Sequence, residues 1–325
     1  MSSLLSRYQK LIEAEISKQK YGEAPASLYE PIRYLMGLGG KRLRPMLVLL
    51  SYSLFKKDVK RIVKYATAVE AFHNFTLMHD DIMDKAPLRR GKPTVHEKWN
   101  VSTAILSGDV MLVKVYDMLL PIEPDKLKKV YTAFNKCAAE VCEGQQWDME
   151  FEEKTFVSED EYLDMIKLKT AVLLGFSLEL GAILAGASLK DCKALREFGT
   201  NIGIGFQLKD DLLDAYGDPK KFGKQVGGDI VANKKTFLLI KALEHAKGQV
   251  KRELHGWLAL RKLRNEDKVS AMKSIYDKLD IPNIAERRID HFFKKGFGKL
   301  STLSCSSTKS AELRQFAELL IGRQS

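Results

Sequence analysis

Two groups of aspartates carry the clearest chemical signal in the sequence. The first aspartate group, Asp80, Asp81 and Asp84, lies within HNFTLMHDDIMDKAPLRRGKPTVH at residues 73–96. On a helix Asp80 and Asp84 share one face because they are four residues apart. Carboxylates this close repel one another unless cations lie between them, and such oxygen ligands suit Mg²⁺, which usually shares its shell with substrate phosphates. The alternative is a solvated acidic turn at the end of a helix.

Basic residues beside the first aspartate group favour a phosphate site over a solvated turn. Arg89 and Arg90 follow Asp84 closely, and arginine side chains bind phosphate oxygens in a bidentate manner. A further basic turn, GGKRLRP at residues 39–45, places two glycines before three cations, so its backbone can approach a ligand. It lacks the glycine spacing and the Ser/Thr of a nucleotide-binding P-loop. Read alone, it would be an ordinary basic turn.

The second aspartate group repeats the pattern in GIGFQLKDDLLDAYGDPKKFGKQVGGD at residues 203–229. It consists of Asp210, Asp211 and Asp214, again with two carboxylates four residues apart and with basic residues and glycines downstream. Two such groups in apolar helical context are improbable by chance. If they face each other across a helical cavity, they can hold several Mg²⁺ ions around one diphosphate. The short GIG sequence indicates no dinucleotide fold, because no strand precedes it.

The elements that position these groups are predicted to be helices. Of nine prolines, seven lie at or before Pro124, so the stretches 126–218 and 230–281 lack the strongest helix breaker. Residues 162–187 are apolar on most sides, as in a helix buried among other helices. There is no βαβ rhythm and no internal repeat, so residues 1–325 are expected to form a single all-helical domain. Loops are expected near residues 37–45, 86–95, 121–125, 217–229 and 296–310.

Composition narrows the class of protein. Hydrophobic residues make up 45% and charged residues 29%, which is typical of a soluble protein, and the formal net charge is +11. That charge indicates either a cationic surface or an anionic partner. In residues 251–325 the excess of Lys and Arg over Asp and Glu is scattered among apolar residues, so we expect no nucleic-acid partner. No run of about 18 apolar residues exists, so no membrane span is expected. The four cysteines match no zinc spacing, which favours reduced thiols and a cytoplasmic location.

In this order of motifs the sequence resembles the trans-isoprenyl diphosphate synthases, the farnesyl and geranylgeranyl diphosphate synthase family. The motifs are GGKRLRP (39–45), HDDIMD (79–84), LRRGKPTVH (88–96), GQQWD (144–148), KT (169–170), FQLKDDLLD (206–214), GK (223–224) and NKKT (233–236). The resemblance implies an all-α, isoprenoid synthase-type helical bundle around a central cavity, usually assembled as a homodimer. It also implies an enzyme that condenses isopentenyl diphosphate with an allylic diphosphate (dimethylallyl, geranyl or farnesyl diphosphate).

The resemblance also implies a role for each matching residue. Asp80 and Asp84 would bind two Mg²⁺ ions with Asp81 in support, and Asp210 would bind a third ion with Asp211 and Asp214 in support. Residues expected to hold the allylic diphosphate are Arg89, Lys169, Lys224 and Lys234. Residues expected to hold isopentenyl diphosphate are Lys41, Arg44, His73 and Arg90. Lys169, Thr170 and Gln207 would act at the reacting centre, with Thr170 and Gln207 beside the developing carbocation.

Three other functions compete with this one. A class I terpene cyclase ionises a similar diphosphate, but such enzymes usually carry Asn and Ser in the second metal motif and need no isopentenyl site. A non-catalytic subunit of a heteromeric prenyl synthase tends to lose motif residues, which this chain keeps. A nucleic-acid-binding protein would leave the paired aspartates unexplained.

Product length depends on the residues just before the first aspartate group. Phe75 and Thr76 precede Asp80 by five and four residues, an aromatic followed by a small residue. This resembles short-chain synthases, and we favour a C20 product slightly over C15. On an ideal helical wheel Thr76 lies near the line of Asp80 and Phe75 lies well off it. The spacing therefore leaves open which of the two side chains meets the growing chain.

Overall fold

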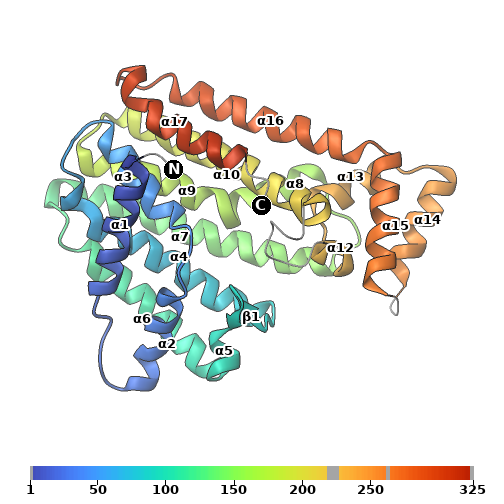
Figure 1. Cartoon of the computed structure of the whole chain (residues 1–325), viewed down its shortest axis with the longest axis horizontal. Helices are drawn as coiled ribbons and strands as arrows, with labels where there is room; N and C mark the ends of the chain where they lie inside the picture. The colour runs from blue at the N-terminus through green and yellow to red at the C-terminus, as the bar shows by residue number, and fades with distance from the viewer. Residues whose placement is uncertain (1–2, 218–226, 261–263, 323–325) are drawn as a thin grey trace. The chain divides into compact units, whose positions relative to one another are not determined.

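The chain folds almost entirely into α-helices (Figure 1). The computed structural model describes residues 3–217, 227–260 and 264–322, and within them the only sheet is a two-stranded hairpin. The predicted all-α class is therefore confirmed. Contacts divide the chain into two compact units, which we call unit 1 (Met1–Asn135 and Phe176–Lys193) and unit 2 (Lys136–Gly175 and Ala194–Ser325).

Each unit is built from consecutive elements plus parts of three longer helices. Unit 1 contains α1 (Ser3–Lys18), α2 (Ala26–Gly37), α3 (Leu43–Ser53), the 3-10 turn η1 (Val59–Ile62), α4 (Val63–Met83), β1 (Leu88–Arg89), β2 (Lys92–Pro93), α5 (Val95–Lys98) and α6 (Val101–Leu119). Unit 2 contains α8 (Glu159–Ile166), the π turn η2 (Lys167–Ala171), α12 (Gly228–Val231), α13 (Phe237–His245), α14 (Gly248–Ala259), α15 (Asn265–Lys278), α16 (Ile281–Leu300) and α17 (Ser307–Ile321). The helices that contribute to both units are α7 (Pro124–Glu153), α9 (Val172–Ala185) and α10 (Leu189–Tyr216).

Helix α4 of unit 1 carries the first aspartate group at its C-terminal end. It contains no proline, and Lys85 just beyond it has a φ of 50°, a left-handed conformation that cannot continue a helix. Helix α6 lies along α4 and begins at Asn100, whose side chain accepts a hydrogen bond from the Thr103 N–H at 2.8 Å. A Cβ on Gly108 of α6 would collide with the His79 ring. The two helices therefore approach closely just before the aspartates.

Helix α8 of unit 2 leads directly into the π turn. The Ser158 hydroxyl accepts a hydrogen bond from the Glu161 N–H, and the Glu161 carboxylate accepts one from the Ser158 N–H, so a capping box starts α8. The π turn inserts one extra residue into the helix before α9 begins, a local irregularity that often marks functional sites. Figure 1 shows α16 and α17 side by side in the C-terminal part of the same unit.

Two glycines let neighbouring helices approach the π turn. A Cβ on Gly144 of α7 would collide with the backbone nitrogen of Lys169. A Cβ on Gly203 of α10 would lie 2.7 Å from the Cα of Ala171, closer than real Cβ atoms come. The widened turn is thus held between α7 and α10, and neither glycine can be replaced without moving it.

The structure differs from the predicted elements at three places. The loop expected near residues 86–95 contains the β1–β2 hairpin, in which Leu88 pairs with Pro93. The loop expected near 296–310 is shorter, because α16 continues to Leu300 and α17 begins at Ser307. The buried helix expected over 162–187 is interrupted by the π turn. Helical spacing shows none of these features, because each depends on single residues or on packing from other helices.

One stretch of the described residues, Glu159–Ala185, has the length and apolar composition of a membrane span. In the structure 78% of its most apolar window is buried inside the protein. Such burial is expected of a core helix, and it agrees with the buried helix that the sequence predicts there.

Candidate active site

The three carboxylates of the first aspartate group have different environments. Asp80 is half-buried at the end of α4, and Asp84, one turn later, is exposed. Asp81 is buried, with 2% of its surface exposed, and both of its oxygens bind Arg89, with Nε to Oδ2 at 2.7 Å and Nη2 to Oδ1 at 2.8 Å. A bidentate pair of this kind is among the stronger protein ion pairs. Asp81 therefore positions Arg89, while Asp80 and Asp84 remain nearer the surface.

The β1–β2 hairpin places Arg89 and Arg90 on different partners. Arg89 returns to Asp81, whereas Arg90, with a φ of 53°, donates a hydrogen bond from Nη1 to the carbonyl oxygen of Gly39. The Arg90 guanidinium lies against Gly40, where a Cβ would be 2.8 Å from Nη2. Gly40 also has a φ of 136°, so both its conformation and this contact require glycine. The hairpin thus brings Arg90 to the basic turn predicted at residues 39–45.

The isopentenyl diphosphate residues predicted from the sequence gather in unit 1. Arg44 Nη1 lies 3.0 Å from His73 Nε2, and Lys41 is exposed on the same basic turn. Burial, followed by the charges of Arg44 and Arg90, holds the pKa of His73 well below its ordinary value. The neutral ring accepts the hydrogen bond from Arg44. The cluster presents cationic side chains to an anion without adding a charged histidine.

Arg42 is a residue that the sequence reasoning did not single out. It is 3% exposed with a φ of 48°, and its guanidinium binds Glu13 Oε1 at 2.9 Å and Glu70 Oε1 at 2.8 Å. A third bond runs from its Nη2 to the Met36 carbonyl oxygen at 2.8 Å. Arg42 therefore anchors the basic turn to α1 and α4. The sequence holds one clue to this role: the basic turn has three cationic residues within four positions, and they cannot all point toward one ligand.

In unit 2 the second aspartate group is also divided by its environment. Asp210 is half-buried, whereas Asp211 is 5% exposed and accepts hydrogen bonds from the Tyr162 hydroxyl and, at 3.3 Å, from Gln207 Nε2. Burial and the nearby charge of Asp229 raise the pKa of Asp211 to about 8. Asp214 accepts a hydrogen bond at its Oδ2 from the Asp229 N–H at 3.0 Å. Asp214 thus ties α10 to the start of α12.

The predicted lysines of unit 2 meet at Asp148, a residue of the GQQWD motif to which the sequence assigned no role. Lys169 Nζ lies 2.5 Å and Lys234 Nζ lies 3.6 Å from Asp148 Oδ2. Burial raises the pKa of Asp148, but Lys234 and Lys169 outweigh it and hold the pKa below its ordinary value. Asp148 therefore keeps two cations together. Lys224, also predicted for the allylic diphosphate, lies outside the described residues.

Thr170 and Gln207, predicted beside the carbocation, are brought together. The Thr170 hydroxyl on the π turn lies 3.3 Å from Gln207 Oε1 on α10. Nearby on α7, Gln145 is 7% exposed, and neither end of its amide has a hydrogen-bond partner among the described residues. Leaving a buried polar group unpaired costs about 1–3 kcal/mol. Gln145 is thus a second GQQWD residue whose chemistry points to a ligand and which the sequence reasoning missed.

The aspartates suit a hard cation that shares its shell with a ligand. Within the described ranges no three His, Cys, Asp or Glu side chains lie close enough to form a metal site by themselves. Mg²⁺ commonly takes only one or two protein carboxylates and completes its octahedron with water and phosphate oxygens. The surface-near pair Asp80 and Asp84 and the half-buried Asp210 fit that requirement. Their role as metal ligands stays a prediction.

The two predicted chain-length residues lie in different settings in unit 1. Phe75 is 7% exposed, and its ring packs edge-on against His79 with centroids 4.8 Å apart and against Phe72 at 5.7 Å. Phe72 in turn contacts Phe134 at 5.1 Å. Thr76 is half-buried, and its hydroxyl donates to the His73 carbonyl oxygen at 2.8 Å. Phe75 thus belongs to an aromatic cluster, whereas the Thr76 hydroxyl bonds back to the backbone of its own helix.

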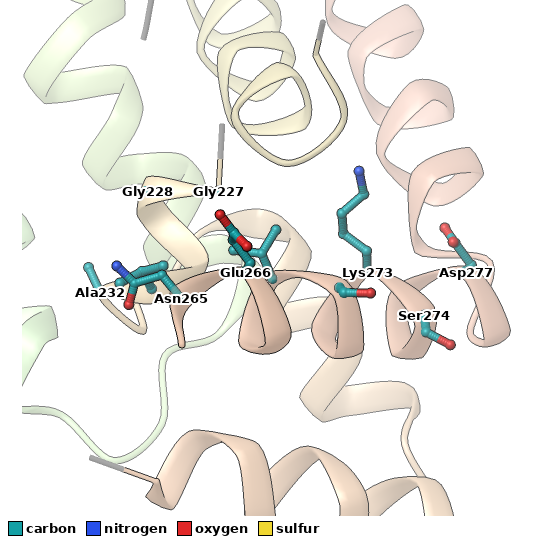
Figure 2. A pocket seen from close by; sticks show the side chains of 11 residues that line it. Gly227, Gly228, Ala232, Asn265, Glu266, Lys273, Ser274 and Asp277 are labelled. Carbon is teal, nitrogen blue, oxygen red and sulfur yellow. The ribbon is translucent and has the colours of Figure 1, made fainter. Parts of the chain in front are cut away.

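A large hollow lies elsewhere in unit 2. It has a volume of about 690 Å³ and runs along α15 beside α12 (Figure 2). Figure 2 shows Glu266, Lys273 and Asp277 on α15 and the glycines Gly227 and Gly228 opposite them. None of the residues predicted from the sequence to do chemistry lines it. Its volume therefore does not mark the reacting centre.

Comparison with known proteins agrees with the motifs. The family described as Polyprenyl synthetase matches residues 25–278. The chain is 37% identical over 315 residues to a geranylgeranyl diphosphate synthase of Methanosarcina mazei, covering 96% of this chain and 95% of the relative. A crystal structure of a geranylgeranyl pyrophosphate synthase is similar with a TM-score of 0.94 and 43% identity, covering 100% of both chains. That of a polyprenyl synthase from Caulobacter crescentus CB15, complexed with calcium and isoprenyl diphosphate, has a TM-score of 0.84 and 25% identity, covering 99% of this chain and 95% of that one. Because the family match spans most of the sequence and every motif in order, this chain is a member of the polyprenyl synthetase family.

Proposed function

We propose that the protein is a magnesium-dependent prenyltransferase that joins isopentenyl diphosphate to an allylic diphosphate and makes a C20 product. The observation that carries this proposal is the contact of Arg90 with the basic turn of Gly39 and Gly40. A cationic cluster next to the first aspartate group and Arg89 supports the binding of a second diphosphate. A terpene cyclase binds a single diphosphate and has no use for the second cationic cluster.

The reaction begins when the allylic C–O bond ionises and the leaving diphosphate gains charge. Bound Mg²⁺ would supply Lewis-acid stabilisation of that charge, held by Asp80, Asp84 and Asp210. Arg89 of unit 1 and Lys169 and Lys234 of unit 2 would add cationic side chains that stabilise the charge of the leaving group. Apolar helix walls would exclude water that otherwise captures the cation.

The allylic cation is then attacked by the isopentenyl double bond. Arg44, Arg90 and Lys41 hold the isopentenyl diphosphate in reach, with His73 supporting Arg44. Oxygen lone pairs of Thr170 and Gln207 face the positive charge. A proton leaves the new cation, and the released diphosphate serves as the base. The geranylgeranyl diphosphate synthase relatives support the C20 length.

We also propose that residues 1–325 form a single functional domain and that two copies of the chain associate. The family match at residues 25–278 runs through both units, which supports one domain. Helix α6 packs on α4 with one side, while apolar side chains on it remain 43–59% exposed: Val101, Ile105, Leu106 and Val113. An exposed apolar stripe on a single helix is typical of an interface between identical chains. Val113→Asp should shift the mass measured by light scattering from dimer to monomer.

The experiment that tests the activity is incubation of the purified chain with Mg²⁺, labelled isopentenyl diphosphate and each allylic primer in turn. We expect extraction and sizing to give mainly C20 product, and chelation of the metal to abolish it. Cyclic hydrocarbon formed from geranyl or farnesyl diphosphate without isopentenyl diphosphate would instead indicate a cyclase. Absence of any product with every primer would contradict the proposal.

A further inference from the structure

Tyr162 is a buried residue of unit 2 to which the reaction above gives no role. It lies on α8, is 2% exposed, and its hydroxyl donates a hydrogen bond to Oδ2 of Asp211 on α10. A buried phenol hydroxyl needs an acceptor, so fold stability alone accounts for one hydrogen bond. Fold stability does not explain why the acceptor is Asp211, the middle carboxylate of the second aspartate group.

Asp211 binds Gln207 through its other oxygen. Gln207 Nε2 lies 3.3 Å from Asp211 Oδ1, one helical turn away on α10. Asp211 Oδ1 is the acceptor in this contact, so it takes the NH₂ end of the amide and turns the carbonyl oxygen of Gln207 to the other side. There Oε1 accepts the hydrogen bond from Thr170 at 3.3 Å. Tyr162, Asp211, Gln207 and Thr170 therefore form one continuous hydrogen-bonded chain.

We propose that Tyr162 and Asp211 are a positioning pair that fixes which end of the Gln207 amide faces the reacting carbon. The inference rests on the proposed function, in which Thr170 and Gln207 lie beside the allylic cation. An amide oxygen carries partial negative charge and stabilises a neighbouring cation, whereas an NH₂ group repels it. A half-turn about the last side-chain bond exchanges the two ends of an unrestrained glutamine. Asp211 removes that freedom, and Tyr162 holds Asp211.

The same division of labour is visible in the first aspartate group. Asp81 is 2% exposed and gives both oxygens to Arg89, just as Asp211 is 5% exposed and gives its oxygens to Tyr162 and Gln207. In both groups the middle aspartate orients a side chain within its own unit. The first aspartate of each group, Asp80 or Asp210, is more exposed and remains suited to a cation.

The test compares Tyr162→Phe, Asp211→Asn and Asp210→Asn in the full-length enzyme. For each variant we would measure kcat, the KM of both substrates, the Mg²⁺ concentration for half-maximal activity, the Kd of an unreactive allylic thiolodiphosphate and the urea midpoint. Tyr65→Phe is the matched control, because Tyr65 is also buried and its hydroxyl donates to the Pro121 carbonyl oxygen at 2.9 Å in unit 1. Tyr162→Phe is also made in a Gln207→Ala background.

We expect Tyr162→Phe to lower kcat by about 10- to 100-fold, the effect of leaving a buried acceptor without its donor. The KM values, the analogue Kd and the Mg²⁺ requirement should change by less than about twofold, and Tyr65→Phe should leave kcat within about twofold. In the Gln207→Ala background Tyr162→Phe should have no further effect, because Tyr162 acts through Gln207. Asp211→Asn should lower kcat without shifting the Mg²⁺ requirement, in contrast to Asp210→Asn, and it tests the proposal even if Tyr162→Phe does not fold.

Two results would overturn this inference while leaving the proposed function intact. In the first, the parent enzyme condenses its substrates, and Tyr162→Phe lowers kcat by the same factor in the Gln207→Ala background as in the parent. The other is an Asp211→Asn variant whose Mg²⁺ requirement rises as much as that of Asp210→Asn. A parent chain that forms no product with any primer would overturn the proposed function itself, and this inference with it.

Discussion

Replacing Phe75 by alanine should lengthen the product. The Phe75 side chain is 7% exposed, and its ring lies between those of His79 and Phe72. His79 is itself confined, because its Nε2 lies 3.2 Å from the Ile105 carbonyl oxygen and Gly108 leaves it no free space on the side of α6. Phe75 therefore cannot swing aside toward α6, and a growing chain that meets it must stop.

The expected shift is large because elongation is favourable until the chain meets a wall. Burying one more isoprene unit of about five carbons contributes roughly 4 kcal/mol at about 0.8 kcal/mol per CH₂, a factor of about 10³. Removing the ring should therefore make products of C25 or longer the main products, and not a minor fraction. Truncating a buried phenylalanine costs about 3–5 kcal/mol of folding free energy, against a total of about 5–15 kcal/mol. The variant should remain folded at 25 °C.

The assay is sizing of labelled products from the parent and from Phe75→Ala with each primer at equal substrate consumption. Phe198→Ala is the matched control, because Phe198 is 1% exposed in unit 2 and its loss is equally destabilising but far in sequence from the first aspartate group. The control should keep the parent product. An unchanged product distribution from Phe75→Ala would refute the reasoning and place the barrier on another helix.

Further outcomes follow from the charged residues. Asp80→Ala and Asp210→Ala should each lower kcat by about 10²–10³ at saturating Mg²⁺, the loss expected for one key electrostatic group, while circular dichroism stays that of the parent; near-normal turnover in both would contradict the metal assignment. Arg89→Ala should raise mainly the KM of the allylic substrate and Arg90→Ala mainly that of isopentenyl diphosphate, because the two guanidinium groups lie on different partners; equal effects on both substrates would remove this division. The lowered pKa of His73 in the folded state means that its contribution to stability is full above the ordinary histidine pKa of about 6.5 and is lost progressively as the pH falls below it. Urea unfolding of His73→Gln, which has no titrating ring, should lack that loss, and an identical pH dependence in both proteins would contradict the assignment.

Local spacing was enough to predict the all-helical class and the helical setting of the two aspartate groups. Asp210 and Asp214 lie on α10, and Asp80 lies in the last turn of α4 with Asp84 at its C-cap, as the separation of four residues and the apolar neighbours predict. Arg44 and His73, predicted to bind the same substrate, lie 3.0 Å apart, and their role in binding it stays a prediction. These features depend on residues near one another in sequence or on motifs that recur as a set.

Features that depend on distant partners could not be predicted. Tyr162 and Asp211 are 49 residues apart, and no periodicity connects them. The role of Arg42 depends on Glu13 and Glu70, which lie on other helices. The π turn depends on glycines of α7 and α10 that leave room for the widened backbone. In each case packing decided the outcome, and packing is a property of the folded chain.

The π turn at Lys167–Ala171 has a consequence for how this enzyme can be engineered or can evolve. A π turn holds one residue more than regular α-helix, so deleting a residue there would restore an unbroken helix with better hydrogen-bond geometry. The same deletion would rotate everything before it by about 100° relative to α9 and draw it in by about 1.5 Å. Tyr162 would then turn away from Asp211, and Lys169 from Asp148. Despite the better helix geometry, the deletion would leave the buried Asp211 without its tyrosine donor, so it would lower stability and turnover together.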